Sequence, residues 1–109
     1  MAIPSRYELK FARVNATSDG DNTVISAVAE KQIVVIGYSV GTNAAGVITF
    51  QSTEASPTIV ASFELTDGGG VVFAGSYDCP AFQLPRGTGF EISTAAGVDA
   101  LGHITYVLT

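Results

Sequence analysis

The sequence predicts an all-β domain, a jelly-roll-like β-sandwich of about eight strands with an N-terminal arm. Glycine, proline and other turn residues interrupt the chain about every 8–12 positions, which is the spacing of short strands in sandwiches and barrels. The segments between these turns are rich in β-branched and aromatic residues, and several alternate between apolar and polar side chains. Helical periodicity is nearly absent, and 109 residues is the size of one domain.

A change in composition near residue 23 divides the chain into two parts. Charged residues are frequent before residue 23 and sparse after it, so we expect an arm with one strand over residues 1–23 and the sandwich over residues 24–109. In the arm, Tyr7, Leu9 and Phe11 alternate with charged residues, which predicts a strand with one buried and one wet face. A polar loop, Asn15–Thr23, is expected to follow it. The expected strands are Arg6–Val14, Val24–Ala29, Gln32–Val40, Gly46–Ser52, Thr58–Thr66, Val71–Ala74, Gly89–Thr94 and Gly102–Leu108.

The segment Gln32–Val40 is apolar on both of its faces. Strand alternation points Ile33 and Val35 one way and places Val34, Ile36, Tyr38 and Val40 on the other side. Both faces of this strand therefore need a cover, from the chain itself or from a partner.

The later strands each have one inward face, separated by turns. Asp67–Gly70 is read as a sharp turn, because glycine accepts positive φ freely. Gly75–Gly87 is expected to be irregular, since its two prolines interrupt strand pairing. The inward side chains expected on these strands are Ile48, Phe50, Ile59, Ala61, Phe63, Leu65, Phe90, Ile92, Ile104, Tyr106 and Leu108.

The composition indicates a surface that is unusually poor in charge. Only 14% of the residues are charged, against about 25% in ordinary soluble proteins, while 47% are hydrophobic. Either small residues coat the domain, or another protein covers part of it. The net charge of −5 argues against a nucleic-acid partner, because binding a polyanion requires a basic patch. No apolar run approaches the length of a membrane span, and the N-terminus has no apolar signal core, so we expect neither a membrane partner nor Sec export.

Candidate catalytic and metal-binding residues lack the companions that such sites require. His103 is the only histidine and no nucleophile motif accompanies it, and Cys79 is the only cysteine, beside an acidic residue that disfavours the thiolate. Asp19–Asn22 lacks the remaining ligand positions of a calcium loop, and no Lys-Ser/Thr pair follows Asp67–Gly70 as in a phosphate loop. Three glutamates could act in pairs as glycosidase carboxylates, but scattered carboxylates are common in sandwiches. These are Glu54, Glu64 and Glu91. We therefore expect no enzyme activity, no cofactor and no metal site.

Four motifs give the chain a resemblance to a known group of proteins. They are Lys31–Tyr38 (KQIVVIGY), Gly46–Ser52 (GVITFQS), Gly69–Val72 (GGVV) and Val98–Val107 (VDALGHITYV). The region of about residues 30–108 resembles small tailed-phage virion proteins known as capsid decoration, cement or head-fibre-like proteins, and the closing GHITYV is its most specific part. Residues 1–23 match no motif of the group, and Ser76–Leu84 lacks its aromatic-rich run.

The resemblance implies a structural virion protein without an active site. Such a protein is made in the host cytoplasm, docks on the outer capsid surface as a homotrimer, and bridges neighbouring subunits of the major capsid protein. We expect the basic residues of the arm, Arg6, Lys10 and Arg13, to contact the capsid. The candidate subunit interface consists of outward-facing valines, Val47, Val60, Val72 and Val107.

A second function class remains open from the sequence. Jelly rolls also serve as receptor- or glycan-binding modules of head or tail fibres, and a fold does not decide a function. The Tyr77–Phe82 loop is the candidate binding loop for that alternative.

Overall fold

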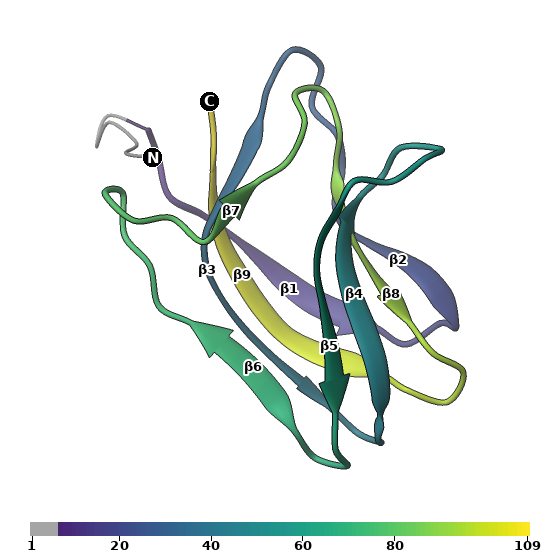
Figure 1. The fold of residues 1–109 in the computed structure, drawn as a ribbon. Helices are drawn as coiled ribbons and strands as arrows, with labels where there is room; N and C mark the ends of the chain where they lie inside the picture. The colour runs from purple at the N-terminus through teal and green to yellow at the C-terminus, as the bar shows by residue number, and fades with distance from the viewer. Residues whose placement is uncertain (1–6) are drawn as a thin grey trace.

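The computed structural model describes residues 7–109, which form two antiparallel β-sheets packed face to face (Figure 1). Sheet A has the strand order β1–β9–β3–β6, with the short β7 also paired to β3, and sheet B has the order β2–β8–β4–β5. The strands are β1 (Lys10–Ala16), β2 (Gly20–Ile25), β3 (Ile33–Thr42), β4 (Gly46–Ser52), β5 (Ile59–Leu65), β6 (Gly70–Phe73), β7 (Phe82–Gln83), β8 (Phe90–Thr94) and β9 (Ala100–Leu108).

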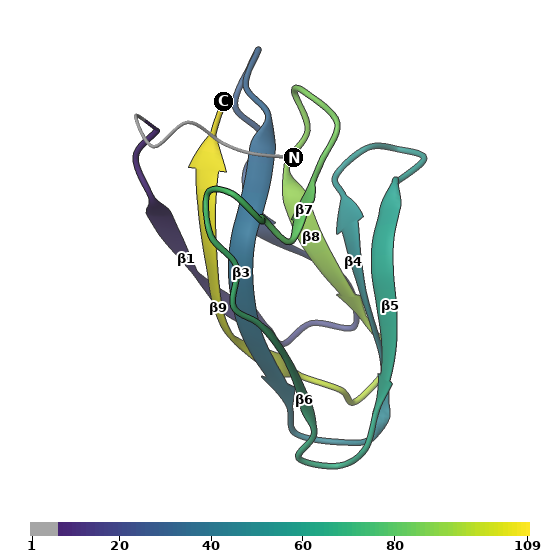
Figure 2. The ribbon, with the colours of Figure 1, turned by 60° about the vertical axis from the view of Figure 1, so that its left-hand side comes forward.

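The connections between strands are those of a jelly roll. With β7 set aside, the chain changes sheet at every connection except the one between β4 and β5, and four strands lie in each sheet. The prediction of an all-β sandwich is confirmed. Figure 2 shows the two sheets edge-on, with their outer faces directed away from each other. Within residues 7–109, no helix is long and apolar enough to cross a membrane.

The core lies between the sheets and centres on an aromatic cluster around Phe50. This side chain is fully buried, and the rings of Tyr38, Phe63 and Phe90 meet it edge-to-face at centroid distances of 5.1, 5.2 and 5.4 Å. Phe82 of β7 packs beside them at 6.1 Å from Phe50. Edge-to-face pairs of this kind add about 0.5–1.5 kcal/mol each beyond the area they bury. The cluster joins both sheets.

The first strand faces the core with its small residues, and the expectation that Phe11 lies on its buried face is wrong. Val14 and Ala16 of β1 are fully buried, whereas the Phe11 side chain is 73% exposed. The cause is the pairing with β9, in which Ala12 lies opposite the buried Ile104. The inward row of β1 is therefore the even-numbered one, which carries the smaller apolar side chains.

The second strand occupies part of the segment expected to be a polar loop. Asn22 organises the turn before it, because its Nδ2 donates to the carbonyl oxygens of Ser18 and Gly20 at 2.8 and 3.0 Å. Its Oδ1 accepts from the Ser18 amide at 3.1 Å. β2 is an edge strand of sheet B with alternating exposed residues. Because β2 is mostly polar, its sequence lacks the hydrophobic alternation that predicts a strand.

A bulge in β5 reverses the expected direction of its first residues. Phe50 lies opposite Ala61 and Gln51 opposite Ile59, so Val60 is an extra residue in the ladder. As a result Val60 packs against the core, and Ile59 is 64% exposed rather than inward.

Candidate functional site

The strand with two apolar faces contains a bulge that divides its side chains between two clusters. Val35 of β3 lies opposite Tyr106, but Gly37 lies opposite Thr105, so Ile36 is extra in the ladder with β9. Ile33 and Val35 join the main core. After the bulge Tyr38 and Val40 also return to the main core, so the expectation that they share a face with Val34 and Ile36 is wrong.

The second apolar face of β3 is covered by the chain itself. Val34, Ile36 and Val107 form a small buried cluster on the outer side of sheet A, and Tyr7 and Tyr77 pack against it. The Tyr77 hydroxyl donates a 2.6 Å hydrogen bond to the carbonyl oxygen of Tyr7. This cover comes from two segments that are far apart in the sequence.

Residues 74–81 reach this position because they leave the sheet between β6 and β7. β6 pairs with the later half of β3 and β7 with its beginning, so both lie along the same edge of β3. Gly75 sits where the chain leaves the sheet, and a Cβ there would lie 2.1 Å from the Ile36 carbonyl oxygen. Only glycine allows this approach between the backbones.

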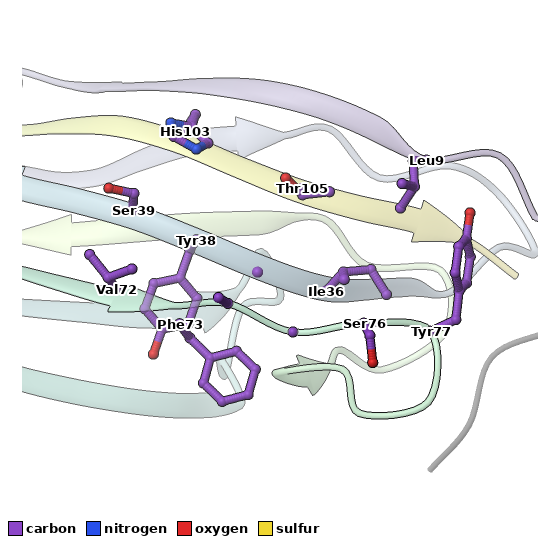
Figure 3. A pocket seen from close by; sticks show the side chains of 13 residues that line it. Leu9, Ile36, Tyr38, Ser39, Val72, Phe73, Ser76, Tyr77, His103 and Thr105 are labelled. Atoms are coloured by element: carbon purple, nitrogen blue, oxygen red, sulfur yellow. The ribbon is translucent and has the colours of Figure 1, made fainter.

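A groove of about 350 Å³ lies on the outer face of sheet A beside this excursion (Figure 3). Figure 3 shows Val72 on β6, Ser39 on β3 and His103 on β9 along the groove, with Tyr77 at one end. Most of the lining is apolar, and the polar side chains in it are serine, threonine, tyrosine and histidine. Such a recess can accept an apolar side chain or a small apolar ligand.

Around the groove, the outer face of sheet A exposes large apolar residues beside Arg13 and His103. Arg13, His103, Ser39 and Val72 form one row across four strands, because each lies opposite the next in the ladder. Val72 is 73% exposed. In the neighbouring rows Phe11 is 73% and Leu101 is 47% exposed. We call Phe11, Arg13, Val72, Leu101 and His103 the sheet A surface.

The outer face of sheet B is different in character, being polar and acidic. Its middle row joins Asp21, Ser93, Thr49 and Ser62, and the hydroxyls of Thr49 and Ser62 lie 3.2 Å apart. Glu64 is exposed opposite Val47, which is 41% exposed. We call Asp21, Val47, Ile59 and Glu64 the sheet B surface.

A buried polar pair lies on the same side of sheet B. Gln51 and Glu91 face each other across β4 and β8, and each is 7% exposed. The Gln51 amide donates to a carboxylate oxygen of Glu91 and, at 3.3 Å, to Oδ1 of Asp21. The amide thus satisfies a carboxylate that has lost most of its contact with water.

The four valines predicted to form one subunit interface do not lie together. Val72 belongs to the sheet A surface and Val47 to the sheet B surface, on opposite sides of the sandwich. Val60 points into the core because of the β5 bulge. Val107 is fully buried beneath Tyr7 and Tyr77. The prediction that Val107 faces a partner subunit is therefore wrong.

The three basic residues predicted to contact a capsid are also separated. Arg6 lies outside the described residues. Lys10 stands at the start of β1 opposite Tyr106, where its Nζ lies 3.7 Å from a carboxylate oxygen of Glu8. Arg13 lies three residues further along β1, so strand alternation places its side chain on the opposite face from Lys10. Lys10 and Arg13 therefore do not form one patch.

The residues considered for chemistry are placed in structural roles. Asp19 accepts a hydrogen bond from the Gly97 amide at 3.2 Å, and Glu54 accepts one from the Ser52 hydroxyl at 2.9 Å. Glu64 and Glu91 lie opposite residues four positions apart on β4, which corresponds to about 13 Å along a strand. Cys79 is an exposed free thiol. Within residues 7–109, no three His, Cys, Asp or Glu side chains are grouped as a metal site would require.

Sequence reasoning missed the exposed Phe11 and Leu101 of the sheet A surface. Phe11 was expected on the buried face because it continues the alternation of Tyr7 and Leu9 with charged residues, and the true inward row offers only the small apolar side chains of alanine and valine. Leu101 precedes the strand expected from Gly102 onward. Its pairing with Asn15 is the signal that places it outward, and this pairing is visible only in the folded sheet.

Comparisons with known proteins add no family to this description. Neither protein-family models, nor curated protein sequences, nor solved structures give a match. The resemblance to phage decoration proteins therefore stays an interpretation of the strand motifs.

Proposed function

We propose that this chain is a structural protein of a tailed-phage virion that binds the outer capsid surface as an oligomer. A homotrimer would bridge neighbouring subunits of the major capsid protein and stabilise the head. The observation that carries the proposal is the exposure of Phe11, Leu101 and Val72 on the same outer face of sheet A. Large apolar side chains gathered on one face mark a contact surface.

The motifs behind the resemblance support a shared scaffold. They lie mainly on β3, β4, β6 and β9, which belong to both sheets. The motifs therefore describe the strands of the sandwich more than its loops. A shared scaffold does not by itself decide the function, because one fold can serve several functions. The capsid partner is therefore argued from the resemblance together with the exposed apolar face.

The proposed mechanism is mechanical. Each subunit of the oligomer contacts the capsid once or more, and separating two capsid subunits would break several of these contacts together. Contacts within one oligomer reinforce each other through effective concentration, so each can be weak. The edge of β1 is our candidate for the capsid contact, because an edge strand can pair with a strand of a partner. Lys10 would assist at its beginning.

A sedimentation assay tests the proposal. Purified protein is mixed with heads of the phage that carries the gene, and we expect it to sediment with them at saturable stoichiometry. The Lys10→Glu variant should bind at least about tenfold more weakly, whereas Lys31→Glu, with the same charge change in a loop, should bind like the wild type. Failure of the wild-type protein to sediment with heads would contradict the proposed function. Deleting residues 1–23 is a poorer test, because it removes the buried Val14 and Ala16.

The groove favours one alternative, a receptor- or glycan-binding module of a phage fibre. Tyr38, Phe73 and Tyr77 line it, and aromatic side chains are common in such pockets. A glycan array probed with the wild-type protein tests this alternative. Binding that is lost in a Phe73→Ala variant would favour it, and an array without hits would count against it.

A further inference from the structure

We infer that Asp67 is a site of spontaneous isoaspartate formation, a modification in which the backbone comes to run through the aspartate side chain. The reaction uses only the chain itself and water, so it needs no enzyme. The inference goes beyond the proposed function, because it concerns a covalent change in the connection between β5 and β6 and holds whether or not the protein binds phage heads.

The connection between β5 and β6 is a tight turn whose ends are fixed. It crosses from sheet B to sheet A at the lower end of the sandwich in Figures 1 and 2. The Gly69 amide donates to the Thr66 carbonyl oxygen at 2.8 Å, and the Gly69 carbonyl oxygen accepts from the Thr42 amide of β3 at 2.9 Å. Gly68 has a φ of 73°, whereas the φ of Asp67 is negative. These angles are those of a type II turn with Asp67 and Gly68 at its centre.

The peptide group between Asp67 and Gly68 is unrestrained. In residues 7–109, the Asp67 carbonyl oxygen, the Gly68 amide and the Asp67 carboxylate make no hydrogen bond or ion pair. Both residues are exposed, and a Cβ at Gly68 would meet nothing within 4 Å. The peptide plane is therefore free to rotate and bring the Gly68 nitrogen to Cγ of Asp67, and glycine has no side chain to hinder this approach.

The reaction closes a succinimide ring and opens it again. The Gly68 nitrogen attacks Cγ of the protonated Asp67 carboxyl group, so that the N–Cγ bond forms and the Cγ–OH bond breaks. The nitrogen loses its proton, which leaves with the hydroxyl group as water. A water molecule then adds to one of the two ring carbonyl carbons. Addition at Cγ restores aspartate, whereas addition at the backbone carbon leaves the chain linked through Cβ and Cγ, with a free α-carboxylate and the same net charge.

The chain contains a second Asp-Gly pair, which the fold restrains. The Asp19 carboxylate accepts a hydrogen bond from the Gly97 amide at 3.2 Å. Gly20 is half-buried opposite Thr94 at the start of β2, and its carbonyl oxygen accepts from Asn22 Nδ2 at 3.0 Å. Ring closure at Asp19 would break the bond to Gly97 and rotate a residue of the β2 ladder. The two pairs have the same sequence, so a difference between their rates must come from the fold.

The modification should loosen one end of β6. A link through Cβ adds a methylene group to the backbone between Thr66 and Gly69, in a turn so tight that a Cβ at Gly69 would lie 2.9 Å from the Thr66 carbonyl oxygen. We expect Gly69 to shift away from Thr42 and the pairing of Gly70 with Gly41 to weaken. Amide exchange at Thr42 and Gly69 should therefore be faster in the modified protein.

Incubation of the protein at mildly acidic pH, where circular dichroism shows it to be folded, tests the inference. Peptide mapping with electron-transfer fragmentation distinguishes isoaspartate from aspartate at each position. We expect isoaspartate to accumulate at least about tenfold faster at Asp67 than at Asp19. The same protein unfolded in urea is the control, and there the two sites should convert at similar rates. Asp67→Glu keeps the charge but would require a larger ring, so it should stay unmodified at this position.

A matched pair of variants gives a second readout. Asparagine forms the same succinimide with loss of ammonia, and the later addition of water converts it to a heavier acid that intact mass spectrometry detects. Asp67→Asn and Asp19→Asn each place asparagine before a glycine. In the folded protein Asp67→Asn should deamidate at least about tenfold faster than Asp19→Asn, and in urea the two rates should be similar.

Three results would overturn the inference. One is a folded protein in which Asp67 stays unmodified during an incubation that converts it in urea. Another is a pair of equal rates at Asp67 and Asp19 in the folded protein, which would show that the turn gives no special freedom. A third is modified protein with unchanged amide exchange at Thr42 and Gly69, which would contradict the expected effect on β6.

Discussion

The Tyr77 hydroxyl donates a 2.6 Å hydrogen bond to the backbone carbonyl oxygen of Tyr7, 70 positions earlier in the chain. This bond joins the excursion between β6 and β7 to the segment that precedes β1. Both tyrosines cover Val34, Ile36 and Val107 on the outer side of sheet A. A small apolar cluster outside the main core is thereby closed by two distant segments.

Removing the hydroxyl should loosen this cover. We expect Tyr77→Phe to lower the free energy of unfolding by about 0.5–1.5 kcal/mol, the usual net contribution of one hydrogen bond. Within the described residues the Tyr106 hydroxyl has no such partner, so Tyr106→Phe is the control. Urea unfolding of both variants measures the difference, and equal stabilities would contradict the role of the bond. Amide exchange should also become faster for residues 7–9 in Tyr77→Phe.

Truncating the centre of the aromatic cluster should be far more damaging than truncating the exposed aromatic residue on β1. Phe50→Ala should cost about 3–5 kcal/mol, because it leaves a cavity among four aromatic rings. Phe11→Ala should change stability by no more than about 0.5 kcal/mol, since its side chain is 73% exposed. Denaturant unfolding compares the two. A large loss in Phe11→Ala would mean that this residue is buried in the folded chain.

Gly102 should tolerate no side chain. A Cβ there would lie 1.9 Å from the Ser39 carbonyl oxygen, so Gly102→Ala would force β9 away from β3. Gly97 also has positive φ, but its Cβ would meet nothing within 4 Å. We expect Gly97→Ala to cost about 1–2 kcal/mol from backbone strain alone, and Gly102→Ala to cost clearly more or to prevent folding. Soluble yield and thermal unfolding measure both, and similar behaviour of the two variants would refute the steric argument.

The buried pair on sheet B should show strong coupling. Gln51→Leu leaves the Glu91 carboxylate without its amide donor and should cost about 1–3 kcal/mol. Adding Glu91→Met to that variant removes the unsatisfied group and should recover most of the loss. A double-mutant cycle by urea unfolding gives the coupling, and strictly additive effects would show that the two side chains act independently.

The sequence was sufficient for the fold class and for much of the core, but not for the direction of several side chains. Phe50, Phe90 and Ile104 are buried as alternation predicts. The bulges at Ile36 and Val60 shift the alternation within single strands, and they follow from ladder pairing with partners distant in the sequence. Periodicity read along one strand cannot contain that information.

The surfaces were harder to predict than the core. The four valines were grouped because each lies at an outward position of its own strand, but the sheet that holds each strand depends on the strand order. That order places Val47 and Val72 on opposite sides of the molecule. The cover supplied by Tyr77 depends on where the excursion folds back, and its irregular sequence carries no periodic signal for this.

The central position of β9 in sheet A has a consequence for biosynthesis. β1 pairs with β9 within its sheet, and one long side of β3 is also occupied by β9. While a ribosome is still translating residues 100–108, β1 therefore has no ladder partner and β3 presents unpaired backbone between two apolar faces. Closure of sheet A must wait until this strand has emerged from the exit tunnel. Nascent chains stalled before Ala100 would be natural clients for chaperones that bind exposed strands.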